Sequence, residues 1–251
     1  MQVVDAHVHV IDPRFPLVPN QGFVPAPFGV PAYRAAVAAA GLDAVGGAVV
    51  AGSFQGVDQR WLLAALADLG PGWAGVAQLP ADVPDTELRA LDDAGVRAVR
   101  FNLARGTAPD RPTLTALARR VHDRHGWGCE LYVDSGDLAD LGPVLTELPR
   151  VSIDHLGMSD RDQPALLRLV ERGVRVKATG FGRVDLDVAA TLRAVHAVDP
   201  RALVFGTDLP GTRARRPFTA GDVDLVAEAL GADALPAVLR ENARSWYRLP
   251  G

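Results

Sequence analysis

The sequence predicts an α/β protein of the (β/α)8 barrel class, folded as a single domain. Short apolar runs rich in Val, Ile and Phe are typical of buried strands, and they alternate with longer Ala-, Leu- and Arg-rich stretches of helical spacing. Eight such units fit into 251 residues, which is the usual size of this barrel. No GxGxxG or GxxxxGK[ST] motif follows the first strand, which weakens the alternative of an open doubly wound sheet.

The strands are expected to begin about 20 to 40 residues apart, which suits strand–helix units. Their expected starts are Val3, Ala44, Trp73, Val96, Gly128, Val151, Val174 and Ala202.

The intervening helices are expected over 31–40, 58–69, 85–94, 113–125, 138–148, 164–172, 187–198, 222–230 and 235–247. The second carries Trp61, Leu62 and Leu66 on one stripe, as an amphipathic helix requires. The third begins with an acidic turn, which the helix dipole favours.

One domain is expected over residues 1–251, with one long irregular segment. Residues 11–30 contain five prolines and two glycines. They follow the first strand, at the end of the barrel where enzymes of this fold build their active sites. The segment is therefore a candidate wall or lid of the active site.

Composition excludes several classes of protein. A hydrophobic content of 48%, a charged content of 22% and a net charge of −4 are ordinary for a soluble protein and disfavour nucleic-acid binding. The single cysteine, Cys129, allows no internal disulfide and no cysteine-rich zinc site. Because neither a signal peptide nor a long apolar stretch is evident, we expect a cytoplasmic protein without membrane contact.

Alternation along the strands places polar side chains inside the barrel near its C-terminal end. In the first strand, Val4, Ala6, Val8 and Val10 are expected to face the helices, opposite Asp5, His7 and His9. The later strands place further polar side chains inward: Arg100, Asn102, Glu130, Tyr132, His155, Lys177 and Asp208.

His7 and His9 form the strongest local motif. Two imidazoles two residues apart on one strand face can chelate one ion, although they can also be ordinary core histidines. Asp208 ends the last strand, where a carboxylate can simply cap a turn. Barrel closure brings the first and last strands together, so we expect Asp208 beside the two histidines as a metal ligand, a general base or both.

Other residues at this end are candidates for substrate contacts. His155 ends the sixth strand and is expected to contact substrate or metal, whereas Asp154 is expected to face away as a structural partner. Arg100 and Arg183 are the preferred carboxylate-binding arginines, because arginine binds carboxylates in a bidentate manner. Further candidates are Asn102, Arg105, Tyr132, Arg213, Arg215 and Arg216.

These motifs resemble the amidohydrolase superfamily. The resemblance rests first on Asp5-Ala6-His7-Val8-His9 and Gly206-Thr207-Asp208. It narrows to the amidohydrolase-2 branch, with its 2-pyrone-4,6-dicarboxylate and sugar-acid lactonases, on segments 12–16, 99–102, 130–134, 154–157, 180–183 and 205–210.

The resemblance implies a hydrolase that opens a lactone or a related ester of a small anionic molecule. His7, His9 and His155 would surround the substrate carbonyl, and Asp208 would deprotonate the attacking water. The residues that would hold substrate are Arg100, Asn102, Tyr132 and Arg183.

The metal content stays open between one divalent ion, zinc first, and none. Ligands would be His7, His9 and Asp208, with His155 as a further one. The resemblance implies that a binuclear centre needs a lysine or glutamate on the fourth strand, whereas the only lysine, Lys177, lies on the seventh.

Three alternatives follow: a metal-dependent decarboxylase, an amidohydrolase acting on a C–N bond, and a non-catalytic barrel that binds an acidic ligand. Tyr132 stands where decarboxylases of the superfamily usually have a histidine, which counts against the first. A homodimer is an open expectation.

Overall fold

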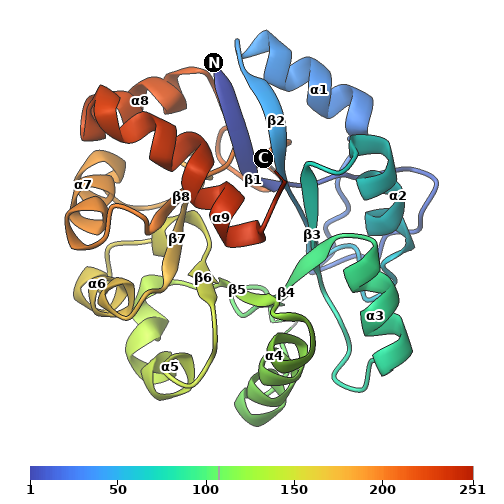
Figure 1. Cartoon of the computed structure of the whole chain (residues 1–251). Coiled ribbons are helices and arrows are strands. Elements are labelled where there is room, and N and C mark those ends of the chain that lie inside the picture. Colours follow the sequence, from blue (N-terminus) through green and yellow to red (C-terminus); the bar gives the residue numbers. More distant parts are fainter. Residues whose placement is uncertain (107, 251) are drawn as a thin grey trace.

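The computed structural model describes residues 1–106 and 108–250, so Thr107 and Gly251 of the expected domain lie outside the described residues. Eight parallel strands pair in chain order from β1 to β8 around a barrel (Figure 1). They are β1 (Gln2–Val8), β2 (Asp43–Val50), β3 (Trp73–Ala77), β4 (Val96–Asn102), β5 (Gly128–Tyr132), β6 (Val151–Ile153), β7 (Arg175–Ala178) and β8 (Leu203–Phe205). Each strand begins within one residue of its predicted start, and the predicted barrel is confirmed.

The helices surround the strands as an outer layer (Figure 1). Their bounds are α1 (Val30–Ala39), α2 (Arg60–Leu69), α3 (Asp85–Asp93), α4 (Arg111–His125), α5 (Leu138–Leu145), α6 (Gln163–Glu171), α7 (Val188–Val198), α8 (Gly221–Leu230) and α9 (Asn242–Tyr247). The last predicted helix, 235–247, is divided into a π-helical turn, Ala237–Glu241, and α9.

Local sequence signals explain where the helices begin and end. Asp110 precedes α4, and its carboxylate accepts a hydrogen bond from the backbone N–H of Thr113. Asp162 and Asp187 cap α6 and α7 in the same way. Such a cap satisfies one of the backbone donors that the first helical turn leaves unpaired. Gly126 ends α4 with a φ of 66°, a left-handed conformation that glycine adopts without steric cost.

Two apolar cores hold the barrel together. The outer core packs the helices against the strands. The inner core lies inside the barrel and consists mainly of small side chains: Val4, Ala6, Ala48, Val50, Ala74, Val76, Ala98, Val204, Ala243, Trp246 and Tyr247. The last three belong to α9, which therefore contributes to the core at the N-terminal end of the barrel. This packing leaves the C-terminal end for polar groups.

The first strand corrects one prediction. Val4 and Ala6 belong to the inner core, whereas Val8 and Val10 belong to the outer one, so the four do not share a face. The pairing of β1 with β2 shifts between Asp5 and Val8, as at a β-bulge. An extra residue in one strand reverses the facing of all residues after it.

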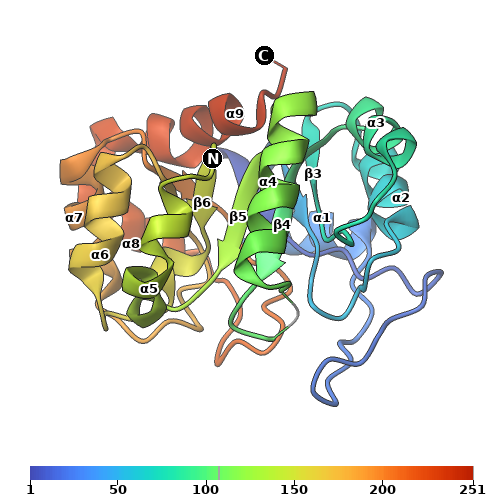
Figure 2. The ribbon, with the colours of Figure 1, turned by 90° about the horizontal axis from the view of Figure 1, so that it is seen from below.

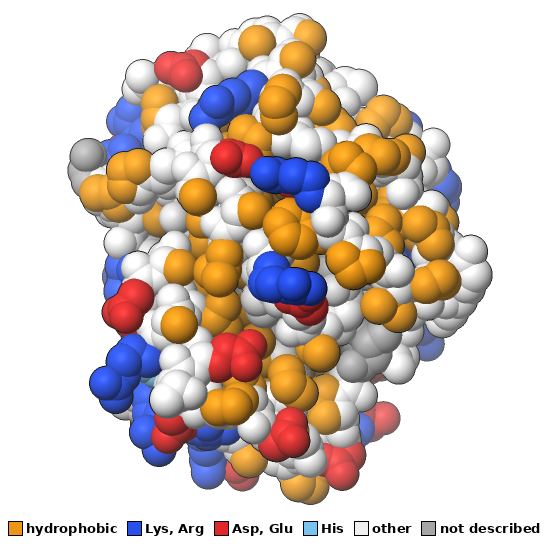
Figure 3. Space-filling view, turned by 90° about the vertical axis from the view of Figure 1, so that its right-hand side faces the viewer, with side chains coloured by type: hydrophobic (Ala, Val, Ile, Leu, Met, Phe, Trp, Pro, Cys, Tyr) orange, Lys and Arg blue, Asp and Glu red, His pale blue; other side chains and the backbone are white. Residues whose placement is uncertain are grey.

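The long loops lie at the end of the barrel opposite the chain termini. Figure 2 shows residues 11–30, in blue, and the orange loop after β8 projecting from this end. On the side of the molecule that Figure 3 displays, acidic and basic side chains are interspersed among hydrophobic ones. None of the helices within 1–106 and 108–250 combines the length and apolar character needed to cross a bilayer.

Candidate active site

Main-chain hydrogen bonds join the ends of β8 and β1. The backbone N–H of Asp208 donates to the carbonyl of His7 at 2.8 Å, and that of His9 donates to the carbonyl of Leu209 at 2.8 Å. A side chain at Gly206 would lie 2.7 Å from the backbone nitrogen of His7, so the strands approach this closely only with glycine there. The predicted proximity of Asp208 to His7 and His9 follows from this contact.

Asp5 anchors the contact from outside the site, which corrects its predicted place beside His7 and His9. Its carboxylate accepts hydrogen bonds from the hydroxyl of Tyr33 at 2.9 Å and from the backbone and hydroxyl of Thr207 at 2.8 and 2.7 Å. Because of the bulge in β1, the side chains of Asp5 and His7 do not point to the same side of the strand. Asp5 therefore positions the residue that precedes Asp208.

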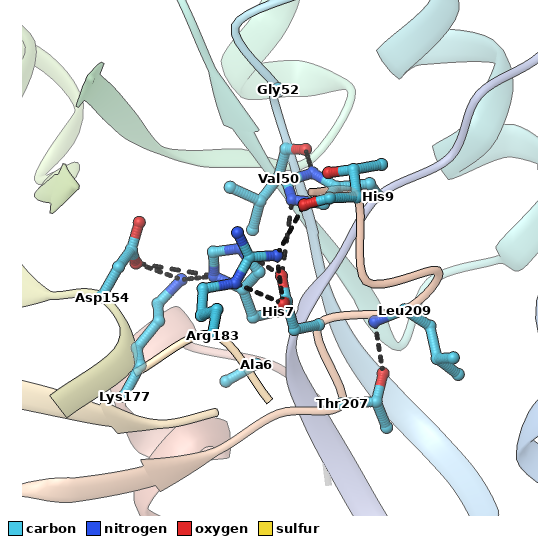
Figure 4. Close-up of polar contacts among 12 residues, drawn as sticks. Ala6, His7, His9, Val50, Gly52, Asp154, Lys177, Arg183, Thr207 and Leu209 are labelled. Atoms are coloured by element: carbon cyan, nitrogen blue, oxygen red, sulfur yellow. Dashed lines mark hydrogen bonds and ion pairs between the residues drawn. The ribbon is translucent and has the colours of Figure 1, made fainter. Parts of the chain in front are cut away.

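Four predicted residues converge below the barrel mouth: His7, His9, His155 and Asp208 (Figure 4 shows His7 and His9). Oδ1 of Asp208 lies 3.8 Å from Nε2 of His7 and 3.7 Å from Nε2 of His9. Three of the buried side-chain atoms that lack a hydrogen-bond partner within the described residues lie here: Nε2 of His7, Nδ1 of His155 and Oδ1 of Asp208. Buried polar atoms are rarely left unpaired, so we expect a bound ligand to supply the missing hydrogen bonds of these three atoms.

His155 and Asp208 both adopt left-handed backbone conformations, with φ values of 52° and 57°. Such values are uncommon for residues other than glycine and are concentrated at functional sites. Val151 and Ile153 pack in the outer core, so alternation along β6 directs Asp154, predicted to face away, into the barrel. Asp154 is fully buried there, and His155, which follows it, is buried as well.

Asp154 binds Arg100. Nε and Nη2 of Arg100 donate to Oδ2 of Asp154 at 3.1 and 2.8 Å, while Nη1 donates to the carbonyl of Ala51 at 2.6 Å. Burial would raise the pKa of Asp154, but the charges of Arg100 and Lys177 hold it well below the usual value. The role of Arg100 as a carboxylate ligand of substrate stays a prediction.

Arg183 binds Asp208. Its Nε donates to Oδ2 of Asp208 at 2.8 Å, and its Nη2 donates to the same oxygen and to the carbonyl of Thr212. Burial raises the pKa of Asp208 to about 6, although the Arg183 charge opposes the shift. The carboxylate is thus ionised at neutral pH and is still basic enough to take a proton.

His9 has a defined orientation. Its Nδ1 lies 2.7 Å from the carbonyl of Val50, which can only accept, so Nδ1 carries the proton and Nε2 presents a lone pair toward Asp208. Burial and the charge of Arg100 lower the pKa of His9 to about 3. The ring is therefore neutral at working pH.

Sequence reasoning did not assign Glu130 and Lys177 to the site. Nζ of Lys177 lies 2.5 Å from Oε2 of Glu130, 3.2 Å from Nδ1 of His7 and 3.6 Å from Oδ1 of Asp154. The hydroxyl of Tyr247 donates to the other carboxylate oxygen of Glu130. The inward alternation of β5 and β7 was the available signal, because it places both charged side chains in a barrel interior where each needs a partner.

A cavity opens above these groups. His9, Arg100, Asn102, Tyr132, His155 and Arg183 line it, together with Arg105, Arg213, Phe23 and Phe54. Phe23 comes from the 11–30 segment, and Nη2 of Arg213 donates to the carbonyl of Asn20 in the same segment. The segment therefore forms part of the cavity wall, whereas its movement as a lid stays a prediction.

The donor atoms are close enough for a metal ion, but their chemistry does not fit a divalent one. The ligand atoms of His7, His155 and Asp208, and those of His7, Glu130 and Asp154, lie within 4.8 Å of one another in each set. In the second set the ammonium of Lys177 already provides the cation. In the first, Asp208 is paired with Arg183. A buried dication would add positive charge where the carboxylates are already neutralised.

Comparison with known sequences identifies the family of this chain. The sequence profile described as amidohydrolase matches residues 4–249. The chain belongs to the amidohydrolase family. The expected amidohydrolase-2 branch is confirmed by this match and by the relatives that follow.

Two characterised proteins and one solved structure are similar to this amidohydrolase. The 2-pyrone-4,6-dicarboxylate hydrolase of Comamonas testosteroni is 35% identical over 165 residues, which are 62% of this chain and only 52% of that protein. The D-galactarolactone isomerase of Agrobacterium fabrum is 27% identical over 243 residues, covering 90% and 82%. An apo structure from Agrobacterium tumefaciens superimposes with a TM-score of 0.88 at 26% identity, covering 99% and 96%.

Proposed function

We propose that this amidohydrolase opens a lactone of a small carboxylated molecule by attack of water. The observation that carries the proposal is the unpartnered Oδ1 of Asp208, which lies beside Nε2 of both His7 and His9 below a cavity lined by arginines. A general base, a nearby imidazole and anion-binding groups are what hydrolysis of an anionic ester requires.

The steps follow from the positions of these groups. Asp208 takes one proton from water, and the remaining hydroxide forms a bond to the lactone carbonyl carbon. The imidazole of His7 stabilises the charge that develops on the carbonyl oxygen. The ring C–O bond then breaks, and the leaving alkoxide receives the proton held by Asp208 or one from His155. The products are a carboxylate and an alcohol in one molecule, with one proton released to solvent.

The charges at the cavity mouth favour an anionic substrate. Arg105 and Arg213 line the cavity beyond the paired Arg100 and Arg183, and both Arg100 and Arg105 lie near the Tyr132 ring, with guanidinium carbons 5.3 and 5.9 Å from its centre. We propose that Tyr132, Asn102 and these arginines hold the substrate carboxylates. The hydrolase relative, by name, acts on a dicarboxylate.

Purified enzyme should open lactones equally well with and without a chelator. The physical reason is that Lys177 and Arg183 already supply the cations of both potential metal sets. A pH-indicator screen of carboxylated lactones measures acid release in the two conditions, and elemental analysis measures bound metal. Activity that a chelator abolishes and zinc restores would instead support the metal-dependent reaction expected as the alternative.

Activity should fall on the acid side with a midpoint near pH 6. The pKa of Asp208 is about 6, so the carboxylate is a base above this value and is protonated below it. kcat/KM should therefore fall about tenfold per pH unit below the midpoint. Because the charge of Arg183 lowers the pKa of Asp208, Arg183→Met should move the midpoint to higher pH. A flat profile between pH 4 and pH 8 would contradict Asp208 as the base.

A lactone isomerase is the second candidate, favoured by the relative from Agrobacterium fabrum. The same base and proton donors can shift a proton within the lactone, or can transfer its acyl group to another hydroxyl group of the same molecule. Neither reaction causes net hydrolysis. Product analysis separates the two, because an isomerase consumes lactone without releasing acid. Release of CO2 would indicate the decarboxylase, and tight binding without turnover would indicate the non-catalytic barrel.

A further inference from the structure

We propose that Lys177 is a positioning residue that places the single imidazole proton of His7 on Nε2, facing the reaction site. The inference deepens the proposed function and rests on it for its catalytic meaning, but the position of the proton can be measured without any substrate. Neither Lys177 nor its partner Glu130 takes part in the steps described above.

Lys177 is held as a cation inside the barrel. The side chain is fully buried, which is rare for lysine unless it is paired. Its Nζ contacts Oε2 of Glu130 at 2.5 Å and lies 3.6 Å from Oδ1 of Asp154. The two carboxylates are the counter-ions of this ammonium. Figure 4 shows the end of the Lys177 side chain near both Asp154 and His7.

The contact with His7 decides which ring nitrogen carries the proton. An ammonium group can only donate, so its contact with Nδ1 of His7 at 3.2 Å requires a lone pair on Nδ1. Oδ1 of Asp154 also faces Nδ1 of His7, but at 3.5 Å it lies farther away than the ammonium at 3.2 Å. A proton on Nδ1 would meet the ammonium first, which disfavours both the other tautomer and the doubly protonated ring. The remaining proton then lies on Nε2.

The direction of this proton suits the reaction. Nε2 of His7 is buried without a partner among the described residues and lies 3.8 Å from Oδ1 of Asp208, too far for a direct hydrogen bond. A substrate oxygen can occupy this position and accept the N–H. Nε2 of a ring in this tautomer has no lone pair for a metal ion, which agrees with the poor fit of the donor set.

His9 takes the opposite role although it lies only two residues away. The carbonyl of Val50 holds the proton of His9 on Nδ1, so its Nε2 accepts. Nε2 of His9 and Oδ1 of Asp208 lie 3.7 Å apart, both as acceptors, and a water molecule can donate to the two. His7 thus provides an N–H donor for the carbonyl oxygen of the substrate, and His9 provides an acceptor for the attacking water.

The proton position is measured by nitrogen NMR on the full-length protein labelled with 15N-histidine. The chain contains six histidines, and the His7 signals are those lost in His7→Gln. We expect a protonated Nε2 and an unprotonated Nδ1 at neutral pH in the wild-type protein. The opposite assignment would overturn the proposal, whatever the protein does with lactones.

Lys177→Met tests whether the lysine sets this state. We expect the His7 proton to move to Nδ1, where Asp154 can accept it, and kcat to fall about 100-fold with little change in KM, as for loss of an oxyanion donor. Tyr247→Phe is the matched control, because it removes a buried hydrogen bond to Glu130 but leaves Lys177 in contact with His7. There the proton should stay on Nε2.

Two further outcomes are decisive. A folded Lys177→Met protein that keeps the His7 proton on Nε2 would refute the positioning role. If Lys177→Met does not fold, the double variant Lys177→Met/Glu130→Leu removes both charges of the pair and permits the same measurement. If the wild type opens no lactone but Nε2 of His7 is protonated, the proposed function is refuted. The role of Lys177 in setting the His7 tautomer would still be supported.

Discussion

Asp208→Asn should lower kcat by about a thousandfold while leaving the fold intact. General-base catalysis contributes roughly 10²- to 10⁴-fold, and an amide of the same shape cannot accept the proton of water. The carbonyl oxygen of the amide can still accept from Nε of Arg183, so the loop after β8 should keep its position. Steady-state kinetics on the preferred lactone measure the loss, and thermal unfolding measures the fold.

Asp222→Asn is a matched control for this substitution. Asp222 is buried and accepts from both terminal nitrogens of Arg216, as a bidentate pair away from the cavity. Loss of its charge should leave turnover unchanged. If Asp208→Asn retained near-normal kcat, water would be activated by another group, and the assignment of the base would be wrong.

The barrel could be predicted from sequence because its signals are local. Apolar runs such as Trp73–Ala77 and capping residues such as Asp110 act within a few positions, and the structure follows them closely. The bulge in β1 could not be predicted in this way. It depends on the pairing of Asp5 and Val8 with the neighbouring strand, and the sequence Asp-Ala-His-Val-His alternates as in a regular strand.

The site was only partly predictable for a related reason. The proximity of His7, His9 and Asp208 follows from closure of the barrel, which the (β/α)8 fold imposes. Asp154 faces inward because Val151 and Ile153 face the helices, and a strand of three residues is too short for its alternation to be read reliably from the sequence. The pairing of Lys177 with Glu130 joins residues 47 positions apart, and only the packed barrel brings them together.

Asp154→Asn should be the most destabilising single substitution in the barrel interior, with a loss of about 3–5 kcal/mol in the free energy of unfolding. Asp154 faces Arg100 and lies 3.6 Å from the ammonium of Lys177, and all three side chains are buried. Removal of the carboxylate charge leaves two buried cations with less compensation. Domains are stable by only about 5–15 kcal/mol, so urea unfolding should detect the change readily.

The double variant Arg100→Met/Asp154→Leu should be more stable than Asp154→Asn. It removes both charges of the pair, and apolar replacement of a buried ion pair costs far less than removal of one partner. Asp58→Asn, which breaks the exposed pair with Arg60, should hardly change the urea midpoint. If the single and double variants at the buried pair were equally stable, Asp154 would contribute little as a counter-ion. Its place beside Arg100 and Lys177 would then have to be explained by the positioning of His7 alone.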